Sequence, residues 1–134
     1  MKRFDERKED FSKALARLKE ALKEPETDLA VDGVLHRFEF TFELAWKTMK
    51  DYLEYIGIMD KTGSPREVIK SAFEYGIIEN GKEWINMMLA RNQLSHLYDE
   101  ETSREIYFDI KEIYVRLLAN LKDKLEENKE QSDK

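Results

Sequence analysis

Apolar residues recur every three or four positions along most of the chain, which is the spacing of one face of an α-helix. The first run ends before Pro25, and the second stops at Gly57, a residue that suits the left-handed cap of a helix. The pattern predicts two long helices, and the second is apolar around so much of its circumference that we expect it at the centre of a bundle or at a subunit interface. The two runs are Phe4, Phe11, Leu15, Leu18 and Leu22, and then Val31, Val34, Leu35, Phe38, Phe42, Ala45, Met49, Leu53 and Ile56.

A short helix is predicted to follow the second long one. Ser64 can cap its start, Pro65 fits the first helical position, and Glu67 completes a capping box. We expect this helix to run to about Tyr75 and to end at Gly76.

Two more long helices are predicted in the last part of the chain. One begins after Gly81 and runs to about residues 96–98. The segment Thr102-Ser103-Arg104-Glu105 is a second capping box that opens the other. Residues 126–134 contain no apolar anchor, and we expect them to fray. The apolar positions of the last helix are Ile106, Ile110, Ile113, Leu117, Leu121 and Leu125.

These elements predict an all-α fold, an antiparallel up-and-down helical bundle of four long helices and one short helix. No segment alternates apolar and polar residues as a half-buried strand would. The length of 134 residues suits one domain. We place that single helical bundle domain at residues 1–125 and a frayed polar tail at 126–134.

Composition narrows the possible chemistry. The chain has no cysteine, which excludes disulfides and thiol nucleophiles. Its two histidines, His36 and His96, are too few for a multi-histidine metal centre, so we expect neither a metal site nor a cofactor. The 23 basic and 29 acidic residues give a net charge of −6, which argues against broad, sequence-blind binding of nucleic acid.

The hydropathy pattern also bears on location. No segment is apolar for long enough to cross a bilayer. The N-terminal residues become acidic and amphipathic at once, without the apolar stretch of a secretory signal. We therefore expect a cytoplasmic protein that does not bind membranes.

The segment 91–98 is the strongest candidate for chemistry. On a helix Arg91 and Tyr98 share a face, whereas His96 points about 140° away from Arg91 at ~100° per residue. The three would converge where the helix end loosens or where a second copy of the chain supplies the opposite wall. Such a trio permits metal-free phosphodiester cleavage, in which His96 moves a proton and Arg91 stabilises the charge on phosphorus. Asn92 and Ser95 would orient the imidazole or the phosphate.

Other polar residues have simpler interpretations. Arg and His at the end of a helix also occur because they interact favourably with the helix dipole, which leaves a purely structural interpretation of Arg91 and His96 open. Glu39 and Glu43 lie four residues apart, and we interpret them as salt-bridge carboxylates rather than metal ligands. We interpret His36 as a polar position beside the core or an interface.

Two segments resemble the signatures of one protein family. Residues 37–48 and residues 91–100 resemble those of the nucleotidyltransferase substrate-binding proteins, and Arg91-x4-His96-x-Tyr98 resembles the motif of the HepT-like branch of the HEPN superfamily. The similarity extends from the first predicted helix to Leu125. His36 stands where the family often has glutamine.

The resemblance implies a homodimer in which the motifs of both subunits face a shared cleft. In HepT-like members it implies a toxin that cleaves RNA without metal, with Arg91 and His96 as catalytic residues. A cognate minimal nucleotidyltransferase would neutralise the toxin by transferring AMP from ATP onto Tyr98. The family name itself implies an alternative, a non-catalytic subunit that binds substrate for a nucleotidyltransferase.

Acidic residues next to the motif oppose indiscriminate RNA binding. Asp99, Glu100 and Glu101 follow the motif directly and would repel RNA phosphates while favouring a protonated His96. A ribonuclease with this sequence is therefore expected to select a structured target. A structural helical dimer with a vestigial motif is the remaining hypothesis.

Overall fold

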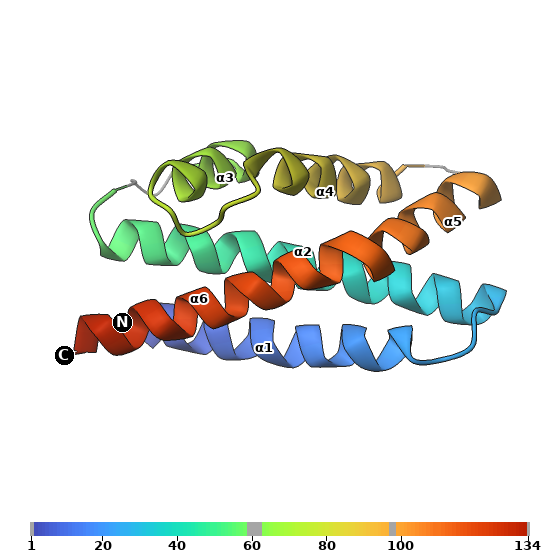
Figure 1. Ribbon diagram of the computed structural model, residues 1–134, viewed down its shortest axis with the longest axis horizontal. Coiled ribbons are helices and arrows are strands. Elements are labelled where there is room, and N and C mark those ends of the chain that lie inside the picture. The colour runs from blue at the N-terminus through green and yellow to red at the C-terminus, as the bar shows by residue number, and fades with distance from the viewer. Residues whose placement is uncertain (1, 59–62, 97–98, 134) are drawn as a thin grey trace.

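The computed structural model describes residues 2–58, 63–96 and 99–133 (Figure 1). Within these ranges the chain is helical and contains no strand, so the all-α prediction is confirmed. The helices in chain order are α1 (Lys2–Leu22), α2 (Asp28–Tyr55), α3 (Pro65–Glu74), α4 (Gly81–Leu94), α5 (Glu100–Asp109), the π-helical segment η1 (Ile110–Tyr114) and α6 (Val115–Asp133).

The helices run up and down the long axis of the molecule (Figure 1). Helix α2 returns antiparallel to α1, α4 runs back above α2, and the last helix crosses them diagonally so that both termini lie at the same end. Helix α2 packs against α1, α3, α4, α5 and α6, which confirms the prediction that the most apolar helix is central. A dimer stays a prediction.

Large aromatic side chains fill the centre of the bundle. Phe42 of α2 packs against Trp84 of α4 with 6.3 Å between ring centroids, and both side chains are buried. Phe38, one turn earlier on α2, stacks on Tyr114 at 5.8 Å. Burying a side chain of this size stabilises the fold by roughly 1.5–3 kcal/mol, and these rings thereby fix α2 against α4 and η1.

Three helix ends agree with the sequence. Ser64 caps α3 by accepting a hydrogen bond from the backbone N–H of Glu67 at 3.3 Å, and Pro65 occupies the first helical position. Gly57 follows α2 with φ of +79°, and Gly76 follows α3 with φ of +75°. A side chain at either glycine would be strained, which explains why glycine ends these helices.

Two helix boundaries differ from the prediction. The last long helix does not start at the Thr102 capping box, because Asp99 caps it three residues earlier by accepting a 2.7 Å hydrogen bond from the Thr102 N–H. Helix α4 ends at Leu94 instead of continuing to about residues 96–98. The backbone N–H and the hydroxyl of Ser95 both donate to the carbonyl of Asn92, which tightens the chain into a turn.

The last helix contains a π-helical segment that the sequence did not reveal. Tyr114 at the end of η1 is buried, whereas Ile113, which we expected on the apolar face, is 37% exposed. Helix α6 continues past Leu125 to Asp133. The fraying of residues 126–134 and the domain boundary at residue 125 stay predictions.

Candidate functional site

A groove between α2 and α4 contains the first residue of the predicted motif. Its volume is about 400 Å³, and it is open to solvent. We call it the α2–α4 groove. It is lined by His36, Glu39, Phe40 and Glu43 of α2 and by Arg91 and Ser95 of α4.

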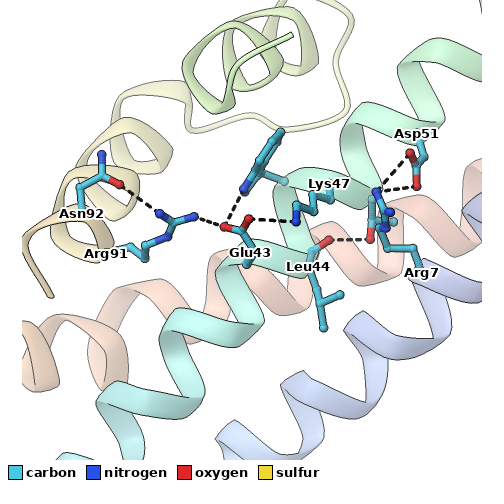
Figure 2. A network of polar contacts seen from close by, with 9 residues as sticks. Arg7, Glu43, Leu44, Lys47, Asp51, Arg91 and Asn92 are labelled. Atoms are coloured by element: carbon cyan, nitrogen blue, oxygen red, sulfur yellow. Dashed lines mark hydrogen bonds and ion pairs between the residues drawn. The ribbon is translucent and has the colours of Figure 1, made fainter. Parts of the chain in front are cut away.

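Arg91 is held in place on three sides, and Figure 2 shows its contacts with Glu43 and Asn92. One guanidinium nitrogen forms an ion pair with the carboxylate of Glu43, and the guanidinium carbon lies 5.5 Å from the centroid of the Phe42 ring. The other terminal nitrogen donates to the side-chain oxygen of Asn92 at 3.3 Å. The Arg91 side chain remains 22% exposed. The guanidinium is therefore fixed in direction and still reachable from the groove.

Glu43 connects Arg91 to its own helix. The oxygen that pairs with Arg91 also accepts a hydrogen bond from the indole N–H of Trp46 at 3.1 Å (Figure 2). Its second oxygen pairs with Lys47 at 3.1 Å. The prediction that Glu43 is a salt-bridge carboxylate is confirmed. Because two cations face one carboxylate, this cluster keeps one net positive charge on a chain of net charge −6.

His96 lies just beyond α4 with an exposed side chain. Its backbone N–H donates to the carbonyl of Gln93 at 3.2 Å, and its imidazole makes no hydrogen bond to another described residue. His96 does not line the α2–α4 groove. A single chain therefore places Arg91 and Ser95 in the groove, with Asn92 hydrogen-bonded to Arg91, and leaves His96 outside it. Tyr98, the predicted nucleotide acceptor, lies outside the described residues.

The acidic residues that follow the motif form the start of α5. The hydrogen bond from the Thr102 N–H lowers the pKa of the Asp99 carboxyl, and Glu100 and Glu101 are exposed in the first helical turn. Carboxylates at a helix N-terminus are stabilised by the helix dipole. The first turn of α5 is thus anionic, as expected from the sequence.

The part of the chain covered by the structure offers no group of three or more His, Asp or Glu side chains that could hold a metal ion. Over the same residues, none of the helices has both the length and the apolar composition that crossing a membrane requires.

The sequence did not connect His36 and Phe40 with Arg91. A signal was present, because His36, Glu39, Phe40 and Glu43 follow one another at intervals of three or four residues and so share one face of α2. The sequence does not show that α4 packs beside that face of α2. Only the fold shows that these side chains and Arg91 line one groove.

Comparison with known proteins places this helical bundle in a family. Residues 6–127 match the family described as nucleotidyltransferase substrate binding protein like. A protein from Haemophilus influenzae named as a probable ribonuclease HepT is 30% identical over 91 residues, which cover 66% of this chain. The chain spans 62% of the length of that relative.

Two solved structures resemble the fold. A crystal structure of a protein from Thermus thermophilus has a TM-score of 0.76 and 32% identity, covering 83% of this chain and 94% of its own. A Haemophilus influenzae protein described as a substrate-binding domain of a nucleotidyltransferase has a TM-score of 0.69 and 23% identity, with coverages of 92% and 96%, and its likeness shows the fold alone.

The described part of the chain is thus a helical bundle of the class described as nucleotidyltransferase substrate binding protein like. The chain belongs to the nucleotidyltransferase substrate-binding protein family, as its two sequence signatures predicted.

Proposed function

We propose that this protein is a HepT-like toxin of a toxin–antitoxin pair, a metal-independent endoribonuclease that acts at the cleft of a homodimer. A cognate minimal nucleotidyltransferase neutralises it by transferring AMP onto Tyr98. It acts in the cytoplasm and requires no cofactor. The relative named as a probable ribonuclease HepT supports this proposal, and so does the geometry around Arg91.

The fixed guanidinium of Arg91 is the observation that carries the proposal. Glu43, Phe42 and Asn92 hold it in one direction before any substrate binds. A cation that is already oriented stabilises the charge that develops on phosphorus without the cost of ordering a flexible side chain.

His96 completes the reaction when two chains meet. One imidazole accepts the proton of a ribose 2′-hydroxyl, and the oxygen attacks the adjacent phosphorus. The bond from phosphorus to the 5′-oxygen breaks, and the second imidazole donates a proton to that leaving oxygen. The products are a 2′,3′-cyclic phosphate and a free 5′-hydroxyl. Because each chain has a single His96, the two imidazoles come from the two subunits, which meet at the cleft of the dimer.

An RNA cleavage assay in the presence of a chelator tests the proposal. The protein is first confirmed by intact mass to carry no AMP. We expect wild type to cleave RNA and His96→Ala to lose at least a hundredfold in rate, the size of a general acid–base contribution. Gln93→Ala, an exposed change on the same helix, is the control and should cleave as wild type does. No cleavage of any cellular RNA by the unmodified wild type would refute the proposal.

The ion pair of Arg91 favours one alternative, a non-catalytic subunit that presents substrate to a minimal nucleotidyltransferase. A guanidinium already paired with Glu43 attracts a phosphate less strongly than a free one. This alternative predicts a stable complex with the nucleotidyltransferase that survives His96→Ala, together with no RNA cleavage by the free protein. Co-purification of the two chains, followed by mass spectrometry of Tyr98 after addition of ATP, distinguishes the two functions.

A further inference from the structure

We propose that the α2–α4 groove binds one nucleotide of an RNA strand, with the base stacked on Phe40 and the phosphate held by Arg91 and His36. This inference rests on the proposed ribonuclease function and deepens it, because it adds a substrate subsite beside the residues that cleave.

Phe40 supplies the stacking surface. The fold leaves its ring 62% exposed, although most large apolar side chains of α2 are buried. The ring lines the same groove as Arg91 and Ser95. An exposed aromatic ring beside a cation is the arrangement with which proteins bind single-stranded nucleic acid, because every base has a face that can stack. Stacking on this ring does not discriminate between bases. Specificity for a target must therefore come from contacts with other parts of the RNA.

His36 supplies a second group for the phosphate. It lies one helical turn before Phe40 and lines the groove from α2, whereas Arg91 reaches it from α4. A protonated imidazole donates N–H hydrogen bonds from both ring nitrogens and adds a positive charge. The imidazole and the guanidinium thus reach the groove from two different helices, and a phosphate between them contacts both.

The charge of the groove depends on the protonation of His36. The carboxylates facing it are Glu39 and Glu43, and the cations are Arg91 and, through its ion pair with Glu43, Lys47. With neutral His36 the two cations and the two carboxylates cancel. With protonated His36 the sum is one positive charge, which attracts a phosphate at short range. Protonation therefore decides whether this groove favours an anion.

The lining favours RNA over a second protein chain as the occupant. Phe40 is the one large apolar side chain among the six lining residues, and the others are polar or charged. The buried centre of a subunit interface is depleted in charged residues. A nucleotide, which offers a base to the ring and a phosphate to the cations, matches this mixture better.

Binding of a fluorescently labelled single-stranded RNA oligonucleotide tests the stacking. All variants carry His96→Ala so that the RNA stays intact. Adding Phe40→Ala should weaken binding about tenfold, the effect of losing one stacked base. The matched control is Phe108→Ala, because Phe108 is 60% exposed but lies among the carboxylates of Glu100, Glu101 and Glu105, and binding should not change. Equal affinities for the two variants would overturn the inference.

The oligomeric state is measured in parallel by light scattering. If Phe40→Ala weakens RNA binding while the oligomeric state is unchanged, the subsite is supported. If the same change dissociates the protein into single chains, the ring belongs to a subunit interface and the inference is wrong.

The pH dependence of binding tests His36. The chain has two histidines, so His96→Ala leaves His36 as its single imidazole. Affinity of this variant should rise several-fold as the solution is acidified, because a protonated His36 adds a positive charge to the groove. Adding His36→Gln should abolish the rise. A rise that persists would assign it to another group that faces the groove, Glu39 or Glu43, and would overturn the role of His36.

The subsite and the proposed function fail separately. Wild type that cleaves RNA with Phe40→Ala binding unchanged refutes the subsite alone. Wild type that never cleaves, together with Phe40-dependent binding, refutes the ribonuclease while the subsite stands as a binding site.

Discussion

The guanidinium of Arg91 is held between the carboxylate of Glu43 and the ring of Phe42, so α2 fixes the direction of a side chain that α4 supplies. Phe42 is itself buried against Trp84 of α4. The candidate site is therefore continuous with the core, and the packing that stabilises the bundle also positions the arginine.

Glu43→Gln should lower the rate of RNA cleavage, because Glu43 holds the guanidinium of Arg91 in position. The amide keeps an oxygen that can accept hydrogen bonds, but it loses the charge that pairs with the guanidinium. A misplacement of a positioned group by about 1 Å can cost ~100-fold in rate, so we expect a fall of about 10–100-fold in kcat with a smaller change in KM. Steady-state cleavage of a labelled RNA measures both constants.

Lys47→Met is the matched control for Glu43→Gln. It removes the other cation of the same carboxylate and leaves the Arg91–Glu43 pair in place. We expect kcat to stay within about threefold of wild type, because exposed ion pairs contribute only about 0–1 kcal/mol. Equal losses in the two variants would contradict a special role for the Arg91–Glu43 pair, because Lys47→Met leaves that pair in place.

Asp51→Asn should not destabilise the protein at neutral pH. Burial on α2 raises the pKa of the Asp51 carboxyl, and the attraction of Arg7 at 3.2 Å offsets this in part. A carboxyl whose folded-state pKa is raised contributes stability below its unfolded pKa and loses that contribution as pH rises through the folded value. We therefore expect the asparagine variant to equal or exceed wild type in urea unfolding at pH 7.

Any gain in stability of Asp51→Asn over wild type should disappear at a pH below the unfolded pKa of aspartate. The wild-type carboxyl is then neutral as well. Arg7→Met is the contrasting variant, since it removes the cation and leaves the buried carboxylate at neutral pH. It should lower stability at pH 7 and change it less in acid. A neutral-pH loss for Asp51→Asn as large as that of Arg7→Met would contradict the direction of the pKa shift.

Asp99→Ala should destabilise the last helix, and Thr102→Ala should do so much less. The Asp99 carboxylate accepts the hydrogen bond of the Thr102 N–H, and alanine at position 102 keeps that N–H. The same bond lowers the pKa of Asp99, so its contribution is present above the unfolded pKa and is lost as pH falls through the folded value. Thermal unfolding of both variants at neutral and acidic pH measures the difference. A larger loss of stability for Thr102→Ala than for Asp99→Ala would show that Thr102 caps the helix.

Helix positions could be predicted because glycine, proline and capping residues act locally. Gly57 and Gly76 require left-handed backbone, and Ser64 accepts from a neighbour three residues away. The start of α5 was harder, because Asp99 and Thr102 both belong to residue types that cap helices. The local sequence contains both candidate caps, and in the structure Asp99 is the one that caps the helix.

The candidate site could be predicted only in part. Arg91 and His96 stand out through their spacing, but the sequence cannot show that α2 presents Glu43 to Arg91. That pairing joins residues far apart in the chain and depends on how two helices pack. The same packing places His36 and Phe40 in the groove of Arg91, which explains why a pattern-based interpretation treated His36 as an ordinary polar position.

Two neighbouring residues of η1 should differ in their contribution to stability. Tyr114 is buried against Phe38, whereas Ile113 is 37% exposed. Tyr114→Ala should therefore cost about 3 kcal/mol or more, as expected for a buried aromatic side chain. Ile113→Ala should cost less than about 1 kcal/mol, since little of its contact with the core is lost. Urea unfolding of both variants measures the two costs, and a larger loss at Ile113 would contradict the burial of Tyr114 in the core.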